Sequence, residues 1–272
     1  MTEHVARTVR RDLRSTGGGA RRGIPWDDFD AAGLSDRDRA KVGAAWAHRR
    51  RQEHLAVGAF ALLARELAED GCDAIVLSLV TRASSDEVRH AEICRQFAVA
   101  LLGRDRVSSR VRGLPQVPMH GRARPADRVL LHVAEMCCIS ETLTGVYLTE
   151  MLARTTDPVA RAVVESLLED EIDHGRVGWA YLAERKREGR LQPLAEALPE
   201  LVDRTIGPVM NTASRAKPHA DEDLERFGYL GPWEAGRIYS RTLRDVILPG
   251  FETLGIRTTV ARSLARERGW FC

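Results

Sequence analysis

The stretches Asp-Glu-Val-Arg-His at 86–90 and Asp-Glu-Ile-Asp-His at 170–174 share the pattern Asp-Glu-x-x-His. His90 and His174 are the only two of the eight histidines that follow a glutamate by three positions. Because residues i and i+3 lie on one face of a helix, each pair offers a carboxylate and an imidazole to a single point. One such pair is weak evidence, whereas two in matching contexts indicate a shared site.

Apolar residues recur at helical spacing on both sides of these stretches, and strand signals are scarce, so the predicted fold class is all-α. Helix starts are expected at capping residues, and helix ends at glycine. A proline in the first turn opens the third and the fourth helix. The four long helices are expected at 36–69, 73–102, 125–154 and 158–189, with Asp36 and Asp157 as the caps of the first and the last. Beyond them, a helix is expected at 194–206 and another from Pro232 to a break at Pro249-Gly250.

The lengths of the connections predict how these helices are arranged. The first and third connections are tight turns, whereas the second, at 103–124, is long and contains glycines and prolines that break a helix. A helix of about 30 residues is roughly 45 Å long. About 20 extended residues can span that length at about 3.3 Å each. Two helical hairpins joined by a long crossover are therefore expected, because an up-down-up-down bundle would not need the long segment.

Such a bundle also needs one glutamate on each of the two remaining helices, level with the Glu-x-x-His pairs. Glu53 and Glu87 lie 18 and 16 residues from the first turn, and Glu141 and Glu171 each lie 15 residues from the last. At 1.5 Å per residue, all four lie roughly 22–27 Å from their turns, near the middle of the bundle. Carboxylates among apolar neighbours cost free energy unless they are paired or bound to metal.

Charge counting favours two divalent metal ions at this level. Four carboxylates neutralise two such ions, and two neutral imidazoles complete the shell. Hard oxygen ligands with one nitrogen per metal suit iron or manganese better than zinc. The alternative is a set of unrelated surface pairs. The candidate metal-ligating and catalytic residues are Glu53, Glu87, His90, Glu141, Glu171 and His174.

Over about residues 36–188 the chain resembles the ferritin-like di-iron carboxylate superfamily. This superfamily includes rubrerythrins, ribonucleotide reductase small subunits, bacterial multicomponent monooxygenases and arylamine N-oxygenases. The resemblance implies a ferritin-like four-helix bundle with a long crossover, two iron ions (with manganese in place of iron as an alternative), and Glu87 and Glu171 as residues able to bridge them. Spacing does not decide which glutamate bridges. The pairs left to the individual ions are Glu53 with His90 and Glu141 with His174.

The aspartates that open the two motifs have an expected role of their own. A metal-bound imidazole usually donates its other N–H group to a carboxylate, which fixes the tautomer. The resemblance suggests a pairing across helices, of Asp170 with His90 and of Asp86 with His174. The alternative is that both aspartates only face solvent.

Departures from individual relatives narrow the function. Rubrerythrins carry a further glutamate just after the third-helix ligand, where this chain has Thr142, Thr144 and Gly145. Arylamine N-oxygenases add a histidine where this chain has Leu167, which puts that activity in doubt. Reductase small subunits place a radical tyrosine where this chain has Cys94. Ferritin itself is shorter and lacks two central histidines, so iron storage is not favoured.

Several residues near the ligands have two interpretations. Gly145 lies one turn after Glu141, where its missing side chain leaves space for a substrate or allows close helix packing. Cys94, Cys137 and Cys138 are expected to fill the core rather than to act in redox chemistry. The C-terminal aromatic residues are expected to pack on the bundle or to roof a pocket; they are Phe227, Tyr229, Trp233, Tyr239, Phe251, Trp270 and Phe271.

Composition limits the remaining choices. The 41 Lys and Arg nearly balance the 39 Asp and Glu, so neither a nucleic-acid partner nor a membrane partner is expected. We find no apolar run of about 18 residues, the length that a membrane helix needs. The basic stretch in 1–35 lacks the apolar core of a secretory signal. The five cysteines contain no Cys-x-x-Cys pair, which excludes a rubredoxin-type iron site within the chain. A cytoplasmic protein is expected, with a flexible tail at 1–35, a bundle at 36–188 and a helical extension at 189–272.

These observations predict a di-iron oxidase or oxygenase. Its expected partners are O2, a small organic substrate, a separate electron donor and a second copy of the chain in a homodimer. The electron donor must be separate because the sequence contains no reductase motif. A rubrerythrin-like peroxide reductase or a ferroxidase is the alternative, and a metal-free helical interaction protein is the third. Roughly 80 residues of additional helix favour the first, since a scavenger needs no substrate lid.

Overall fold

A computed structural model describes residues 23–108, 110–111 and 123–271 of the 272-residue chain. Within these ranges the secondary structure is helical and includes no strand, which confirms the predicted all-α class. Most of the predicted N-terminal tail and most of the predicted crossover lie outside the described residues.

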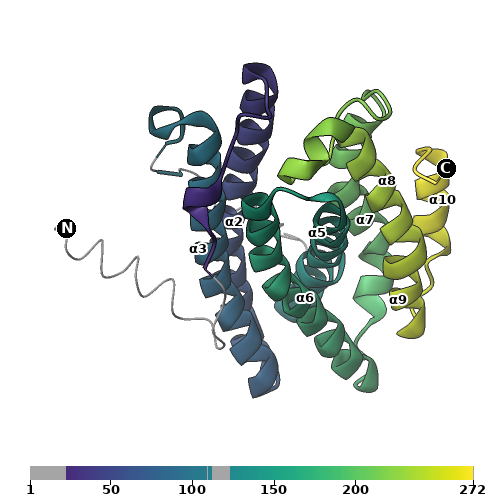
Figure 1. The fold of residues 1–272 in the computed structure, drawn as a ribbon. Helices are drawn as coiled ribbons and strands as arrows, with labels where there is room; N and C mark the ends of the chain where they lie inside the picture. Colours follow the sequence, from purple (N-terminus) through teal and green to yellow (C-terminus); the bar gives the residue numbers. More distant parts are fainter. Residues whose placement is uncertain (1–22, 109, 112–122, 272) are drawn as a thin grey trace.

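The first two long helices, α2 (Asp36–Asp70) and α3 (Ala74–Leu102), form an antiparallel hairpin (Figure 1). Ser35 caps α2, because its side chain accepts a hydrogen bond of 3.2 Å from the backbone N–H of Asp38. The cap lies one residue before the predicted one. At the other end, Gly71 has a φ of 70°, a left-handed conformation that ends the helix without strain in glycine.

The third long helix is continuous but not uniform. It consists of α4 (Pro125–Val133), a π-helical segment η3 (Ala134–Glu141) and α5 (Thr142–Arg154). The sequence predicts a regular α-helix here, because a π segment keeps the same residue types and leaves no signal of its own. π segments inside helices are frequent at functional sites, and Glu141 lies at the end of this one.

Helix α6 (Pro158–Arg187) begins as predicted. The carboxylate of Asp157 accepts hydrogen bonds of 3.1 and 2.8 Å from the backbone N–H groups of Val159 and Ala160. Further along α6, Gly178 allows a close approach to η3, since an added Cβ would overlap the side chain of Cys137. The π segment is therefore held directly against α6.

Contacts at the helix ends establish the direction of each helix. Leu102, at the end of α3, packs against Gly43 near the start of α2. His132, in α4, contacts Glu66 near the end of α2. The end of α3 and the start of α4 therefore lie at opposite ends of the hairpin, as the predicted arrangement requires. Helix α3 and the third long helix consequently run in the same direction.

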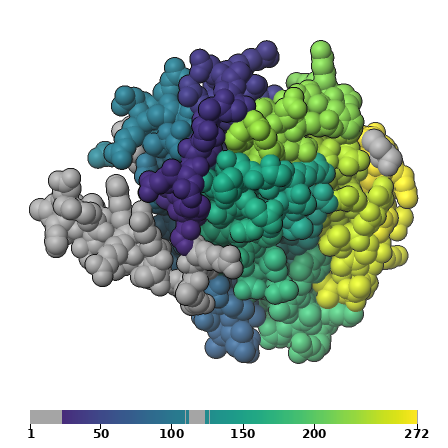
Figure 2. Space-filling view, in the orientation of Figure 1, coloured from purple at the N-terminus to yellow at the C-terminus, as the bar shows by residue number. Residues whose placement is uncertain are grey.

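The C-terminal helices lie beside α5 and α6, on the side away from α2 and α3 (Figure 1), and form one flank of the surface in Figure 2. Between α7 and α8, a 3₁₀ segment η4 (Glu222–Phe227) contacts α2 and α6. The helices are α7 (Gln192–Ala213), α8 (Pro232–Thr242), α9 (Leu248–Thr253) and α10 (Thr259–Glu267).

Two predicted helix ends in this part are wrong. Helix α7 continues seven residues past the predicted end at Ile206, through Pro208, because its buried face packs against the neighbouring helices. The predicted break at Pro249 does not occur either. A π-helical segment, η5 (Leu243–Ile247), joins α8 to α9, and the proline follows in the first turn of α9, where a missing N–H costs little.

The interior contains two hydrophobic clusters with a polar layer between them. The Trp46 cluster includes Phe97, Leu148, Leu167 and Ile238 of α8, and the Phe60 cluster includes Leu63, Leu67, Tyr181 and buried residues of α7, η5, α9 and α10. In α2, Glu53 lies between Trp46 and Phe60, and the three other long helices pass from one cluster to the other in the same way. The predicted carboxylate layer therefore crosses the middle of the bundle.

Two expectations from composition need correction. Residues 23–35 were expected to belong to a flexible tail, but Ile24, Trp26 and Phe29 pack against the Trp46 cluster. The helix over Asp127–Arg154 is long and apolar enough to cross a membrane, although no such run was expected. Of its most apolar stretch, 67% is buried inside the protein, as in the central helix of a core.

Candidate metal centre

The polar layer brings together all six side chains that the sequence predicts as ligands. They form two groups, and within each group the ligand atoms lie within 4.8 Å of one another. Glu87 and Glu171 belong to both groups, which matches the bridging role that the resemblance implies. The groups are Glu53, Glu87, His90 and Glu171, and Glu87, Glu141, Glu171 and His174.

These side chains have almost no contact with solvent. Glu87 and Glu171 are each 1% exposed and His90 is 0% exposed, while Glu141 is half-buried. Burial therefore makes the charges of the cluster costly, which favours their neutralisation by one another, by protons or by bound cations.

The imidazole atoms that face the carboxylates have no hydrogen bonds. Nδ1 of His90 lies 3.4 Å from Glu87 and 3.5 Å from Glu171, and Nδ1 of His174 lies 3.2 and 3.5 Å from the same two residues. None of these contacts has hydrogen-bond geometry, and one oxygen each of Glu87 and Glu171 is also without a partner. Buried polar atoms are nearly always paired. The cluster is therefore able to bind metal, and its donor set fits two divalent ions.

The outer nitrogens of both imidazoles face the predicted aspartates across the helix pair. Nε2 of His90 is hydrogen-bonded to Asp170 at 3.1 Å, which confirms that pairing. Nε2 of His174 lies 3.6 Å from Asp86, a contact without hydrogen-bond geometry. Asp170 also contacts Arg89 and lies 3.5 Å from Arg82, so it is anchored from two sides. Each imidazole is thus oriented with Nδ1 toward the carboxylates.

We expect Asp170→Ala to weaken metal binding by about 10–100-fold, because His90 loses the partner that fixes its tautomer. Asp86→Ala should have a smaller effect, since its contact with His174 is longer. A competition titration of Mn(II) or Fe(II) against a chelator measures the affinities. Asp173→Ala is the matched control, because Asp173 lies in the same motif and is 43% exposed. Equal affinities for Asp170→Ala and the control would rule out the orienting role.

The ionisable groups of the cluster share protons in a definite pattern. Burial raises the pKa of Glu53 to about 8, with a further contribution from Glu87 and Glu171. Burial likewise raises the pKa of Glu141 well above its usual range. Burial also acts against the charged form of His90, but the carboxylates of Glu171 and Glu87 outweigh it and raise the pKa to about 9. Glu53 and His90 are therefore largely protonated at neutral pH when no metal is bound, and burial favours the neutral form of Glu141.

The bridging candidates behave in the opposite way. Burial disfavours the ionised form of Glu171, yet the adjacent imidazoles of His174 and His90 hold its pKa well below the usual range. The pKa of Glu87 is lowered by the same two imidazoles, against burial and the charge of Glu171. The pKa of His174 is raised, because Asp86 and both bridging candidates outweigh its burial. Without metal, burial thus favours the neutral forms of Glu53 and Glu141, whereas charge counting from the sequence treated all four glutamates as anionic.

Metal binding should therefore release protons. Glu53 and His90 of the metal-free cluster have pKa values above 7, so the binding of two divalent ions should displace protons from both. Because protons compete with metal, affinity should rise with pH through the range of about 8 to 9, in which these two groups lose their protons. Calorimetric titration in buffers of different ionisation enthalpy counts the protons. A binding enthalpy that is independent of the buffer would contradict this assignment.

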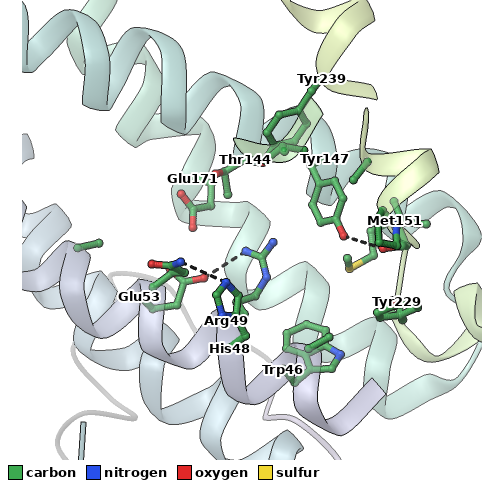
Figure 3. Close-up of a pocket in the computed structure, with 18 of the residues that line it drawn as sticks. Trp46, His48, Arg49, Glu53, Thr144, Tyr147, Met151, Glu171, Tyr229 and Tyr239 are labelled. Carbon is green, nitrogen blue, oxygen red and sulfur yellow. Dashed lines mark hydrogen bonds and ion pairs between the residues drawn. The ribbon is translucent and has the colours of Figure 1, made fainter. Parts of the chain in front are cut away.

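A cavity of about 520 Å³ adjoins the cluster (Figure 3). All four candidate glutamates line it, together with Thr144, Tyr147 and Met151 of α5. The opposite wall comes from the C-terminal part and includes Tyr229, Leu230 and Tyr239. Two of the seven C-terminal aromatic residues thus line a pocket, while Phe227, Phe251 and Trp270 are buried in the clusters. Both expected roles of these aromatics therefore occur.

Gly145 is placed differently from the expectation. No atom lies within 4 Å of the position that its Cβ would take, so it does not serve close helix packing. The cavity is lined by its neighbour Thr144 rather than by Gly145 itself. The cysteines agree with the expectation, since Cys94, Cys137 and Cys138 are buried and free, and burial raises the pKa of each thiol.

Arg49 is a site residue that the sequence reasoning missed. Its guanidinium donates a hydrogen bond of 3.2 Å to Glu53 and lies 5.6 Å from the ring centre of Tyr147. Burial disfavours its charge, but Glu53 outweighs this and raises the pKa of Arg49. Its position four residues before Glu53, on the same helix face, is a signal that could have identified it. The other nearby histidines are not ligands: His54 is exposed, and His132 contacts Glu66.

No family model matches this chain, and no curated protein or solved structure matches it significantly. The doubled Asp-Glu-x-x-His motif and the clustering of its side chains are therefore the observations from which a function is inferred.

Proposed function

We propose that this protein is a di-iron oxidase or oxygenase that activates O2 to oxidise a small organic substrate. The observation that carries the proposal is the cavity beside the cluster, because all four candidate glutamates line it. Its volume of about 520 Å³ is within the range of small-molecule sites, about 300–1,000 Å³. A ferroxidase or peroxide scavenger needs no such space next to its metals.

We further propose that the bundle is ferritin-like. The two hairpins, the crossover and the parallel course of α3 and the third long helix agree with that topology. The ligand pattern also agrees, since α2 and the third long helix each supply one glutamate, while α3 and α6 each supply a Glu-x-x-His pair.

The chain's own residues would then divide the work. Glu53 with His90 would hold one ion and Glu141 with His174 the other, and Glu87 and Glu171 would contact both. Three carboxylates and one imidazole per ion favour iron or manganese. Two ferrous ions bound here would supply two electrons to O2. The two hydrophobic clusters exclude water above and below the layer, and Asp170 keeps the His90 ring in place. Further electrons would come from a separate donor.

Anaerobic loading with Fe(II), followed by rapid mixing with O2 or with hydrogen peroxide, tests the function. We expect the bound iron to be oxidised by O2 within seconds, at a rate that exceeds that of free Fe(II) in the same buffer. A reaction with peroxide alone would favour the rubrerythrin-like alternative. Failure to bind iron would leave the metal-free interaction protein as the better reading.

A further inference from the structure

The cavity beside the metal centre contains one guanidinium, that of Arg49. On the outer side of Arg49, the exposed residues His48 and Gln52 form the rim, with their side chains 3.2 Å apart. On its inner side, Arg49 donates a hydrogen bond to Glu53 (Figure 3). Anything that enters from the rim toward the glutamates must pass this charge.

Charge counting shows that Arg49 lacks a counterion once metals are bound. Two divalent ions would neutralise the four glutamates that line the cavity. One of these glutamates is Glu53, the partner of Arg49. Arginine does not lose its proton in proteins. Apart from His48 at the rim, no other cationic residue among the described ones lines the cavity. The loaded cavity therefore carries about one uncompensated positive charge, which an anion would balance.

A second donor lies on the same helix face. Trp46 precedes Arg49 by three residues, lines the cavity and is 2% exposed. Its indole N–H has no hydrogen-bond partner within the described part of the chain. Buried donors are nearly always paired, so this N–H also calls for an acceptor. That nitrogen has almost no accessible surface, however, so Trp46 contributes only ring surface to the wall beside Arg49, and the anionic group is placed at Arg49 alone.

The rest of the lining is apolar or aromatic. The rings of Tyr147 and Tyr239 meet edge to face, with centres 6.2 Å apart. The hydroxyl of Tyr147 is already engaged, because it donates to the carbonyl oxygen of Leu230 at 3.3 Å. Met151 and Ala235 add further apolar surface. A ligand that matches this lining has an anionic end and an apolar body.

We propose that the cavity binds a monocarboxylic acid, with its carboxylate at Arg49 and its body against Tyr147, Tyr239 and the ring of Trp46. This proposal rests on the proposed function, since it names the substrate class of the same site. A carboxylate matches the fork of one guanidinium and brings one negative charge. A phosphate monoester carries about −1.5 to −2 and would remain partly uncompensated. Because Arg49 also contacts Glu53, the carbon atoms next to the carboxylate lie nearest the metal centre.

Calorimetric titration of anaerobic Fe(II)-loaded protein tests the proposal. The probes are benzoate and octanoate, the corresponding neutral amides, and phenyl phosphate. We expect the better acid to bind about 10–100-fold more tightly than its amide, the range for hydrogen bonds to a charged group. Arg49→Gln should remove this preference, whereas Arg65→Gln, an exposed arginine of the same helix, should retain it. An amide that binds as well as its acid, or phenyl phosphate that binds more tightly than either acid, overturns the proposal.

A second variant keeps the test decisive if Arg49→Gln loses metal through its contact with Glu53. Arg49→Lys keeps a positive charge at this position and should still bind the acid more tightly than the amide, with a smaller preference because lysine lacks the guanidinium fork. Equal binding of acid and amide by Arg49→Lys with two ions bound would contradict the proposal. Metal content is measured separately. Two ions bound without a preference for acids overturns this proposal alone, whereas absence of metal overturns the proposed function as well.

Discussion

Replacing Glu87 and Glu171 together by alanine is expected to reduce bound iron from about two ions per chain to nearly none. These two residues belong to both ligand groups, so the double variant removes two of the four ligands from each ion at once. Each ion would keep one carboxylate and one imidazole, too few to retain it against dilution. Elemental analysis after anaerobic Fe(II) loading and desalting measures the content.

The matched control also removes two glutamates from the long helices, but at exposed positions. Glu69→Ala combined with Glu165→Ala deletes two exposed glutamates of α2 and α6, each of which pairs only with an arginine one turn earlier. This control should bind as much iron as the unaltered protein. Circular dichroism establishes that both double variants are folded. Unchanged iron content in Glu87→Ala with Glu171→Ala would refute the metal site.

Metal should also stabilise the fold strongly, and Glu141→Gln should abolish that effect. When free metal exceeds its dissociation constant about 1,000-fold, binding adds about 4 kcal/mol to the free energy of unfolding. For a chain of this size that corresponds to a rise in melting temperature of about 10 °C. Glutamine is a poor metal ligand, so the variant should lose most of this shift. Thermal melts with and without Fe(II), under anaerobic conditions, measure it.

The metal-free melting temperature adds a separate check. Burial raises the pKa of Glu141 well above its usual range, which favours the neutral carboxyl without metal, and glutamine resembles that form in shape. Glu141→Gln should therefore melt close to the unaltered protein when metal is absent. Glu150→Gln, which alters surface ion pairs on the same helix, should keep the full metal-dependent shift. A metal-induced shift of equal size in Glu141→Gln would contradict the ligand role.

The sequence predicted those parts of the site that depend on local periodicity. The Glu-x-x-His spacing places two ligands on one helix face, and cap residues such as Asp157 mark where helices begin. Helix length then sets the height of each ligand in the bundle. Because the hairpin turns align Glu53 with Glu87 and Glu141 with Glu171, local rules were sufficient to place all six ligands in one layer.

The parts that were missed depend on contacts between segments far apart in the sequence. The cavity forms where α2 and α5 meet the chain around Tyr229 and Tyr239, and no periodicity in any one segment indicates that meeting. The π segments have the composition of ordinary helix. Helix α7 continues past Ile206 because of its neighbours, although glycine and proline follow immediately in the sequence. In each case tertiary packing outweighs the local signal.

The unequal positions of the two hydrophobic clusters bear on how this protein can evolve. The cavity adjoins the Trp46 cluster, since Trp46, Met151 and Leu230 belong to both, whereas no buried member of the Phe60 cluster lines it. Hydrophobic cores accept many substitutions that conserve volume. Stabilising changes can therefore accumulate around Phe60 without altering the cavity wall, while changes around Trp46 reshape the cavity. Under the proposed function, selection can adjust substrate preference at one end of the bundle and robustness at the other.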